Sequence, residues 1–317
     1  MRLLVTGGAG YIGSVAAAML VDRGHEVVVL DSGATGHSDA VPPGAEFVPA
    51  DLLDAEALVG KLAGGFDGVL HFAARALVGE SVERPDLYFR TNVVGTLNLL
   101  DAMRANDVDR IVFSSTAATY GEPDSIPITE DAPTRPTNPY GASKLAVDSL
   151  LRSYAPAYQM AAVSLRYFNV AGAYGGARER HDPETHLIPN LLKAVHRDGG
   201  APFTLHGTDY DTPDGTCIRD YVHVEDLAEA HLLALMDAKP GEHRIYNLGS
   251  GSGYSVREVL EVVEQVTGRQ VPIVEGPRRP GDPARLVASS ERIESELGWH
   301  RNKSLQDMVR DAWQAMP

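Results

Sequence analysis

The feature that most constrains this chain is a glycine-rich segment near the amino terminus, Thr6-Gly7-Gly8-Ala9-Gly10-Tyr11-Ile12-Gly13. It follows a strand-length apolar run and opens a helix-length segment, and its spacing fits both G-x-x-G-x-x-G and G-x-G-x-x-G. Without Cβ atoms the chain can turn tightly and bring backbone N–H groups, at a positive helix N-terminus, against a pyrophosphate. A plain glycine turn is the alternative, but strand, motif and helix in this order predict a dinucleotide site.

The first half of the chain alternates short apolar runs with segments of helix length. We expect strands at Leu3–Thr6, Glu26–Leu30, Glu46–Pro49, Gly68–Phe72, Arg110–Ser114 and Ala161–Tyr167. Helices are expected between them, at Tyr11–Arg23, Ala55–Leu62, Asp86–Ala105 and Tyr140–Ala155. Apolar, valine-rich strands that alternate with helices predict a parallel sheet covered on both faces, which is a doubly wound, Rossmann-type α/β fold.

The second half has Gly-, Pro- and His-rich connections and shorter helices, expected at Leu187–Arg197, Val224–Met236, Val256–Thr267 and Leu305–Met316. We therefore predict an NAD-binding domain over residues 1–169 and a smaller α/β domain, mainly for substrate, over residues 170–317. This boundary is soft, because segment 216–248 can return to the main sheet through the apolar run Ile245–Leu248.

The cofactor is predicted from Asp31, which ends the second strand 18 residues after Gly13. A carboxylate there can hold ribose hydroxyls and would repel a 2′-phosphate, so NAD is favoured over NADP. A solvated loop aspartate is the alternative. Asp51-Leu52 follows the third strand, where it either meets the adenine edge or caps a helix through Asp51.

The reactive groups are predicted from Tyr140 and Lys144, whose spacing of four places both on one helix face. An ammonium near a phenol favours the phenolate, so we expect Lys144, aided by an oxidised cofactor ring, to lower the Tyr140 pKa. Tyr140 can then accept a proton near neutral pH. Ser114-Ser115-Thr116 closes the fifth strand, where a hydroxyl can bond the reacting oxygen and relay its proton.

Composition excludes several classes of protein. The formal net charge of −15 argues against a nucleic-acid-binding protein, and the longest apolar runs are too short for a membrane span. The single cysteine, Cys217, cannot form an internal disulfide, which favours the cytoplasm. The 11 histidines show neither H-E-x-x-H nor an open metal-ligand pattern, so we expect no metal.

Together, the glycine motif, the Ser/Thr strand end and Tyr140-x-x-x-Lys144 resemble the extended short-chain dehydrogenase/reductase family over essentially the whole chain. Within it, other blocks are similar to the UDP-glucose 4-epimerases: His71-Phe72-Ala73-Ala74, Val78-Gly79-Glu80-Ser81, Arg166-Tyr167-Phe168-Asn169, Arg219-Asp220-Tyr221-Val222-His223-Val224 and Gly281-Asp282. The resemblance implies that UDP-glucose and UDP-galactose are interconverted at C4 through a transient 4-keto sugar, with tightly bound NAD.

The resemblance also implies the roles of individual residues. Thr116, Tyr140 and Lys144 would be catalytic. NAD would contact Gly7, Gly10, Tyr11, Ile12, Gly13, Asp31, Asp51, Leu52, Phe72, Ala73, Ala74, Asn92, Ser114, Tyr140, Lys144 and Tyr167. The UDP-hexose would contact Thr116, Asn169, His186, Leu187, His206, Arg219, Tyr221, Arg279 and Asp282.

The residue types agree with these substrate roles. Two arginines, Arg219 and Arg279, can form charge-assisted hydrogen bonds to a pyrophosphate, and the Asp282 carboxylate can accept hydrogen bonds from ribose hydroxyls. Arg278 could exchange roles with Arg279, and surface ion pairing is the alternative for Arg219 and Arg279.

Some positions depart from the family pattern. Ala76 replaces a cofactor-facing lysine, His186 a substrate-binding asparagine, and His206 an aromatic residue near uracil. Leu286 stands where relatives gate the sugar N-acetyl pocket, and some of them carry a larger tyrosine there, so we expect N-acetylated sugars to enter. The helix that contains Leu97–Leu100 pairs two copies in this family, which implies a homodimer unless it packs only within the chain.

Other functions stay open. The substrate could be UDP-N-acetylglucosamine or UDP-glucuronate, or the chain could be a non-catalytic NAD-sensing protein, although intact Thr116, Tyr140 and Lys144 argue against a sensor. A dehydratase is disfavoured because Ala117-Ala118 stands where dehydratases carry Asp-Glu after the strand-end threonine. A reductase that uses NADP is opposed by Asp31.

Overall fold

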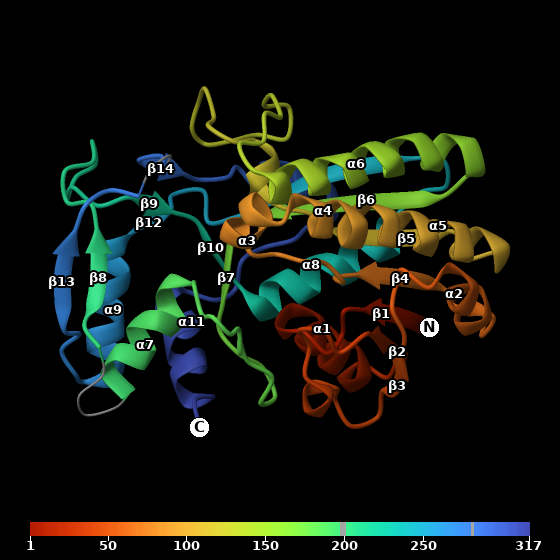
Figure 1. The fold of residues 1–317 in the computed structure, drawn as a ribbon, viewed down its shortest axis with the longest axis horizontal. Coiled ribbons are helices and arrows are strands. Elements are labelled where there is room, and N and C mark those ends of the chain that lie inside the picture. Colours follow the sequence, from red (N-terminus) through yellow and green to blue (C-terminus); the bar gives the residue numbers. More distant parts are fainter. Residues whose placement is uncertain (197–200, 280–281) are drawn as a thin grey trace.

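The computed structural model describes residues 1–196, 201–279 and 282–317 (Figure 1). Its centre is a seven-stranded parallel sheet in the order β11-β6-β5-β4-β1-β2-β3. The strands are β1 (Arg2–Thr6), β2 (Glu26–Asp31), β3 (Glu46–Pro49), β4 (Gly68–His71), β5 (Arg110–Ser114), β6 (Ala161–Tyr167) and β11 (His243–Leu248). The predicted doubly wound α/β fold is confirmed.

Helices cover both faces of the sheet, because successive strand residues point to opposite sides. Leu3 and Val5 pack into the core beneath α1 (Tyr11–Asp22) and α8 (Val224–Asp237). Leu4 packs into the other core, beneath α2 (Ala55–Leu62), α5 (Gly95–Ala105) and α6 (Pro139–Tyr158). Both strand faces are therefore buried, which is why these strands read as continuous apolar runs.

The expected helix Asp86–Ala105 is wrong as a single element. The chain instead forms α4 (Pro85–Tyr88), a π-helical stretch (Phe89–Val94) and then α5. The wider turn contains Asn92, whose side chain is 2% exposed and bonds to groups near the predicted active site. π-Helical turns occur often at functional sites, and apolar periodicity does not reveal them. The short helices α3 (Val78–Glu83), η1 (Ser38–Ala40) and η3 (Ala117–Thr119) were also not predicted.

The remaining elements form a smaller α/β unit. Figure 1 shows α7 (Leu187–His196), α9 (Val256–Thr267) and α11 (Leu305–Gln314) grouped beside β8 (Phe203–His206) and β13 (Ile273–Gly276). The other small sheets pair β7 (Asn169–Ala171) with β10 (Tyr221–His223), and β9 (Ile218–Arg219) with β12 (Tyr254–Ser255) and β14 (Arg285–Leu286). Helix α10 (Glu291–Leu297) packs near β11.

The apolar run Ile245–Leu248 does return to the main sheet, where β11 lies beside β6. Strands β9 and β10, which precede it, stay in the small sheets. Residue Arg197, the expected end of one helix, lies outside the described residues. Among the residues that the structure describes, no helix has both the length and the apolar character needed to cross a bilayer.

Candidate active site

The glycine segment forms a closed turn between β1 and α1. Gly7 has a φ of +74°, and a Cβ there would lie 2.5 Å from the backbone nitrogen of Ala73. A Cβ on Gly13 would lie 2.3 Å from the Gly7 carbonyl oxygen. Gly10, at the N-cap of α1, offers no side-chain cap, so the first N–H groups of that helix are available to an anion. The turn therefore fits the pyrophosphate of a dinucleotide.

Asp31 is held beside this turn at the end of β2. Its Oδ2 accepts a hydrogen bond from the Ala9 N–H at 3.0 Å, and its Oδ1 accepts one from the Gly33 N–H at 2.8 Å. These bonds fix a carboxylate where a doubly wound fold binds ribose hydroxyls. The N-cap alternative for Asp51 is wrong, because Asp54 caps α2 by accepting from the Ala57 N–H, whereas Asp51 accepts from the Leu53 N–H.

The loop after β4 joins the glycine turn to the reactive helix. The Phe72 N–H donates to the Thr6 carbonyl, and Ala73 packs against Gly7. Asn92 clamps the next part of this loop: its Oδ1 accepts from the Arg75 N–H, and its Nδ2 donates to the Arg75 carbonyl and to Ser143 Oγ. Because Ser143 Oγ donates to the Tyr140 carbonyl, Asn92 connects this loop to the first turn of α6.

Two buried residues of this network, His71 and Ser143, were not predicted as site residues. His71 is fully buried between Thr6 Oγ1 at 2.6 Å and Thr96 Oγ1 at 2.8 Å. Burial, and then the charge of Lys144, lower the His71 pKa to about 3, so this imidazole is neutral. A polar residue inside an otherwise apolar strand is the one sequence signal that could have indicated it.

Lys144 is anchored below the site. Its Nζ donates to the Ser114 carbonyl at 2.8 Å and lies 4.7 Å from the Phe113 ring centre. Burial lowers the pKa of Lys144 to about 7, and the negative charge of Asp148 opposes that shift. Ser114 Oγ is in turn hydrogen-bonded to the Tyr167 hydroxyl. The predicted strand-end hydroxyl and Lys144 are thus brought together.

The expected lowering of the Tyr140 pKa is wrong for the chain without a cofactor. Burial raises the pKa of Tyr140, and a hydrogen bond with Thr116 only partly opposes the rise. The Lys144 ammonium instead donates to the Ser114 carbonyl, and burial lowers the pKa of Lys144 itself. Ionisation of the phenol therefore requires further positive charge nearby.

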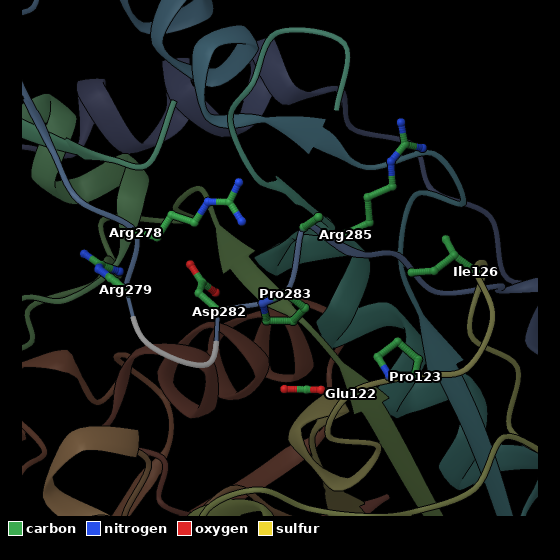
Figure 2. Close-up of a pocket in the computed structure, with 9 residues that line it drawn as sticks. Glu122, Pro123, Ile126, Arg278, Arg279, Asp282, Pro283 and Arg285 are labelled. Atoms are coloured by element: carbon green, nitrogen blue, oxygen red, sulfur yellow. The ribbon is translucent and has the colours of Figure 1, made fainter. Parts of the chain in front are cut away.

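The substrate side contains a cavity of about 540 Å³, lined by Glu122, Arg279, Asp282 and Arg285 among others (Figure 2). Arg219 pairs with Asp282, which brings two of the predicted substrate residues together. Arg278 also lines the cavity, but its guanidinium bonds to Asp209 Oδ1 at 2.8 Å and lies 4.4 Å from the Tyr210 ring centre. Within the described part of the chain, Arg279 has no carboxylate partner, so it is the freer of the two.

The other predicted substrate residues are not among those that line this cavity. Asn169 Nδ2 donates to the Asp220 carbonyl, Tyr221 is buried, and His206 Nδ1 lies 3.3 Å from the Pro277 carbonyl. Leu187 begins α7. His186 is not among the residues that line the cavity of about 540 Å³.

His186 instead pairs with Glu179 and Glu184, and its ring lies 5.2 Å from that of His181. Burial lowers the pKa of His186, but its hydrogen bonds to both glutamate carboxylates outweigh that effect and raise the pKa to about 10. No pattern in the sequence had indicated that these four side chains meet.

Comparison with known proteins agrees with this geometry. Residues 3–249 match the model of the NAD dependent epimerase/dehydratase family. The UDP-glucose 4-epimerase of Corynebacterium glutamicum is 56% identical over 99% of this chain and 95% of its own length, and that of Streptomyces lividans is 54% identical with the same coverage. The structure of the Brucella ovis UDP-glucose 4-epimerase in complex with NAD has a TM-score of 0.93 and 44% identity, covering 99% of this chain and 97% of that one.

These matches confirm the predicted resemblance and the choice of NAD. The glycine turn, the fixed Asp31 carboxylate and the Tyr140–Lys144 helix are the parts of the structure that correspond to a nicotinamide-dependent active site. The chain belongs to the NAD dependent epimerase/dehydratase family.

Proposed function

We propose that this protein is a UDP-glucose 4-epimerase, which interconverts UDP-glucose and UDP-galactose through a transient 4-keto sugar. One observation carries the proposal: Thr116, Tyr140 and Lys144 gather at the carboxyl end of the sheet, beside a glycine turn fitted to a dinucleotide. Full-length relatives at 47–56% identity that bear this name support it.

In this proposal Tyr140 takes the proton from the C4 hydroxyl, directly or through Thr116, and later gives it back. When bound, NAD supplies reversible hydride transfer at C4 and the positive charge that the Tyr140 phenol lacks in the structure. Lys144 holds the Ser114 carbonyl, and Asn92 and Ser143 fix the first turn of the helix that carries Tyr140. These residues position the phenol and exclude water from it.

Inversion requires the sugar to turn over between the two hydride transfers. The diphosphate must therefore be held firmly while the hexose has few contacts. We assign the diphosphate to Arg219 and Arg279 and the uridine ribose to Asp282, with the other predicted substrate residues except His186 around them. Binding then requires Arg219 to exchange its Asp282 partner for phosphate oxygens.

The net redox change of epimerisation is zero, so the cofactor should remain bound between turnovers. The test is conversion of UDP-galactose to UDP-glucose by the purified protein without added NAD. Sustained turnover is expected, with a bound dinucleotide released on denaturation. Strict dependence on stoichiometric external NAD would contradict the proposal and favour a reductase.

A second substrate class has support of its own. The UDP-Glc/GlcNAc 4-epimerase of Campylobacter jejuni has a TM-score of 0.86 and 36% identity to this chain, covering 99% of this chain and 98% of that one. Leu286, the predicted gate, lies half-buried on β14 directly opposite Arg219 of β9. Turnover on UDP-glucose, both N-acetylated UDP-hexoses and UDP-glucuronate separates these substrates. N-acetylated sugars are expected to react, because leucine is smaller than tyrosine.

The homodimer also belongs to this proposal. Leu99 and Leu100 are fully buried in the core of the chain itself, so only part of the predicted Leu97–Leu100 stretch could meet a partner. Exposed apolar side chains remain on the π-helical stretch before α5, namely Phe89 and Val94, and at the end of α6, namely Tyr158. Sedimentation of the wild type and of a Val94→Asp variant tests this: a dimer that the substitution dissociates is expected, and a monomeric wild type contradicts it.

A further inference from the structure

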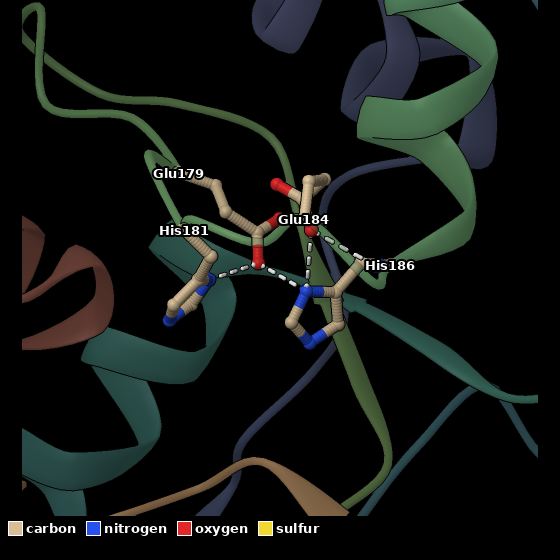
Figure 3. Close-up of side chains that lie close together, drawn as sticks. All are labelled: Glu179, His181, Glu184 and His186. Atoms are coloured by element: carbon tan, nitrogen blue, oxygen red, sulfur yellow. Dashed lines mark hydrogen bonds and ion pairs between the residues drawn. The ribbon is translucent and has the colours of Figure 1, made fainter. Parts of the chain in front are cut away.

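Four side chains converge in the connection between β7 and α7: Glu179, His181, Glu184 and His186 (Figure 3). Nδ1 of His181 lies 2.9 Å from Glu179 Oε1, and Nδ1 of His186 lies 2.7 Å from the same oxygen. Nδ1 of His186 also lies 2.9 Å from Glu184 Oε1. One ligand atom from each of the four residues lies within 4.8 Å of all the others.

Only histidines face the two carboxylates of this cluster among the described residues. The Glu179 and Glu184 side chains are only 7% and 3% exposed. In the described residues, no arginine or lysine forms an ion pair with either carboxylate: Arg180 pairs with Asp39, and Arg178 and Lys193 only line the adjoining cavity. Buried carboxylates are costly unless they are paired or bind a metal, and one protonated imidazole would neutralise only one of the two.

Single atoms in this cluster are shared between several partners. An imidazole Nδ1–H can donate fully to one acceptor, yet His186 Nδ1 faces two carboxylates. The imidazoles of His181 and His186 both point at one oxygen of Glu179. Glu184 is fixed independently, because its Oε1 accepts from the N–H groups of Thr185 and His186. The four side chains are thus directed at a shared centre rather than at separate partners.

We propose that Glu179, His181, Glu184 and His186 bind one divalent transition-metal ion, with zinc as the expected occupant. Two imidazoles and two carboxylates make a four-ligand set, and zinc accepts both ligand types in tetrahedral geometry. A dication at the centre balances both glutamates and removes the competition at His186 Nδ1. Four protein ligands leave no open position, so the role is structural rather than catalytic.

The ion would hold the loop that leads into α7. This loop also contacts the cofactor side of the molecule, since Arg180 pairs with Asp39, and Tyr11 of α1 donates to the Gly172 carbonyl. The spacing E-x-H-x-x-E-x-H lies on a loop and not on one helix face, so no helical periodicity in the sequence indicates it.

The experiment measures metal binding without substrate, so its outcome is independent of the proposed epimerase activity. The full-length protein is purified, and its metal content is measured by mass spectrometry. Stripped protein is then titrated with ZnCl2 against a chromophoric chelator, and with CoCl2 to record the visible spectrum. The variants are His181→Asn and Glu184→Gln, and the matched controls are His300→Asn and Glu291→Gln at exposed positions.

The wild type and both controls should bind about one zinc ion per chain and give the intense visible spectrum of tetrahedral cobalt. The variants His181→Asn and Glu184→Gln should each lower the zinc affinity by more than does the loss of a residue that only supports a ligand, which is about 10–100-fold. Equally weak zinc binding by the wild type and His181→Asn would overturn the proposal and leave an ion-pair network. If the variants fail to fold, an octahedral cobalt spectrum of the stripped wild type would overturn it equally.

Discussion

Gly13→Ala should open the glycine turn and weaken NAD binding. The new Cβ would lie 2.3 Å from the Gly7 carbonyl oxygen, and real Cβ atoms essentially never approach closer than 3.0 Å, so the turn must open by about 0.7 Å. The backbone of Ala73 limits the space beside Gly7, since a Cβ built on Gly7 would lie 2.5 Å from the Ala73 backbone nitrogen. Overpacking of this kind costs about 1–3 kcal/mol.

If that cost falls on cofactor binding, it corresponds to a loss of about 5–150-fold in affinity. The assay is the NAD content of the purified variant, followed by titration of the stripped protein with NAD. The control is Gly60→Ala in α2, where nothing lies within 4 Å of the added Cβ and about 0.5–1 kcal/mol of stabilisation is expected. Equal NAD affinity in Gly13→Ala and Gly60→Ala would refute the reasoning.

Three further predictions concern the surrounding groups. Asn92→Ala leaves the two Arg75 backbone groups without their side-chain partner and removes the donor to Ser143 Oγ. Urea denaturation should therefore show a loss of about 1–3 kcal/mol, and a loss near zero would mean that water replaces the amide. In cofactor-free protein the folded state releases the Lys144 proton near pH 7, whereas the unfolded chain keeps this proton up to about pH 10.5. The free energy of unfolding, compared with that of Lys144→Met, should therefore rise with pH between these values, by at most about 1.4 kcal/mol per pH unit. A difference that does not change with pH would contradict the lowered pKa. Leu286→Tyr should slow turnover of UDP-N-acetylglucosamine more than that of UDP-glucose, and equal rates in wild type and variant would remove Leu286 as a gate.

The parts of the fold that could be predicted are those determined by local pattern. Strands such as β2 consist almost wholly of buried apolar residues, and the glycine turn is specified by residues that are adjacent in the sequence. The carboxyl ends of parallel strands meet at one edge, so Asp31, Ser114 and Thr116 could be placed near the cofactor from the order of elements alone.

The parts that could not be predicted depend on contacts between distant residues. The direction of the Tyr140 pKa shift depends on burial and on a hydrogen bond with Thr116, 24 residues away. Arg278 and Arg279 are distinguished only by Asp209, which belongs to another loop. The Glu179–His186 cluster depends on the path of a loop, which no periodicity describes.

The central claim is that Tyr140 moves the proton on a protein that already holds its cofactor. The most direct measurement is the rate of UDP-galactose epimerisation by Tyr140→Phe, with the NAD content of the same preparation. Loss of a general acid–base group should lower the rate by about 10²–10⁴-fold while the NAD content stays at the wild-type level. An unchanged rate in Tyr140→Phe with NAD bound would contradict the account.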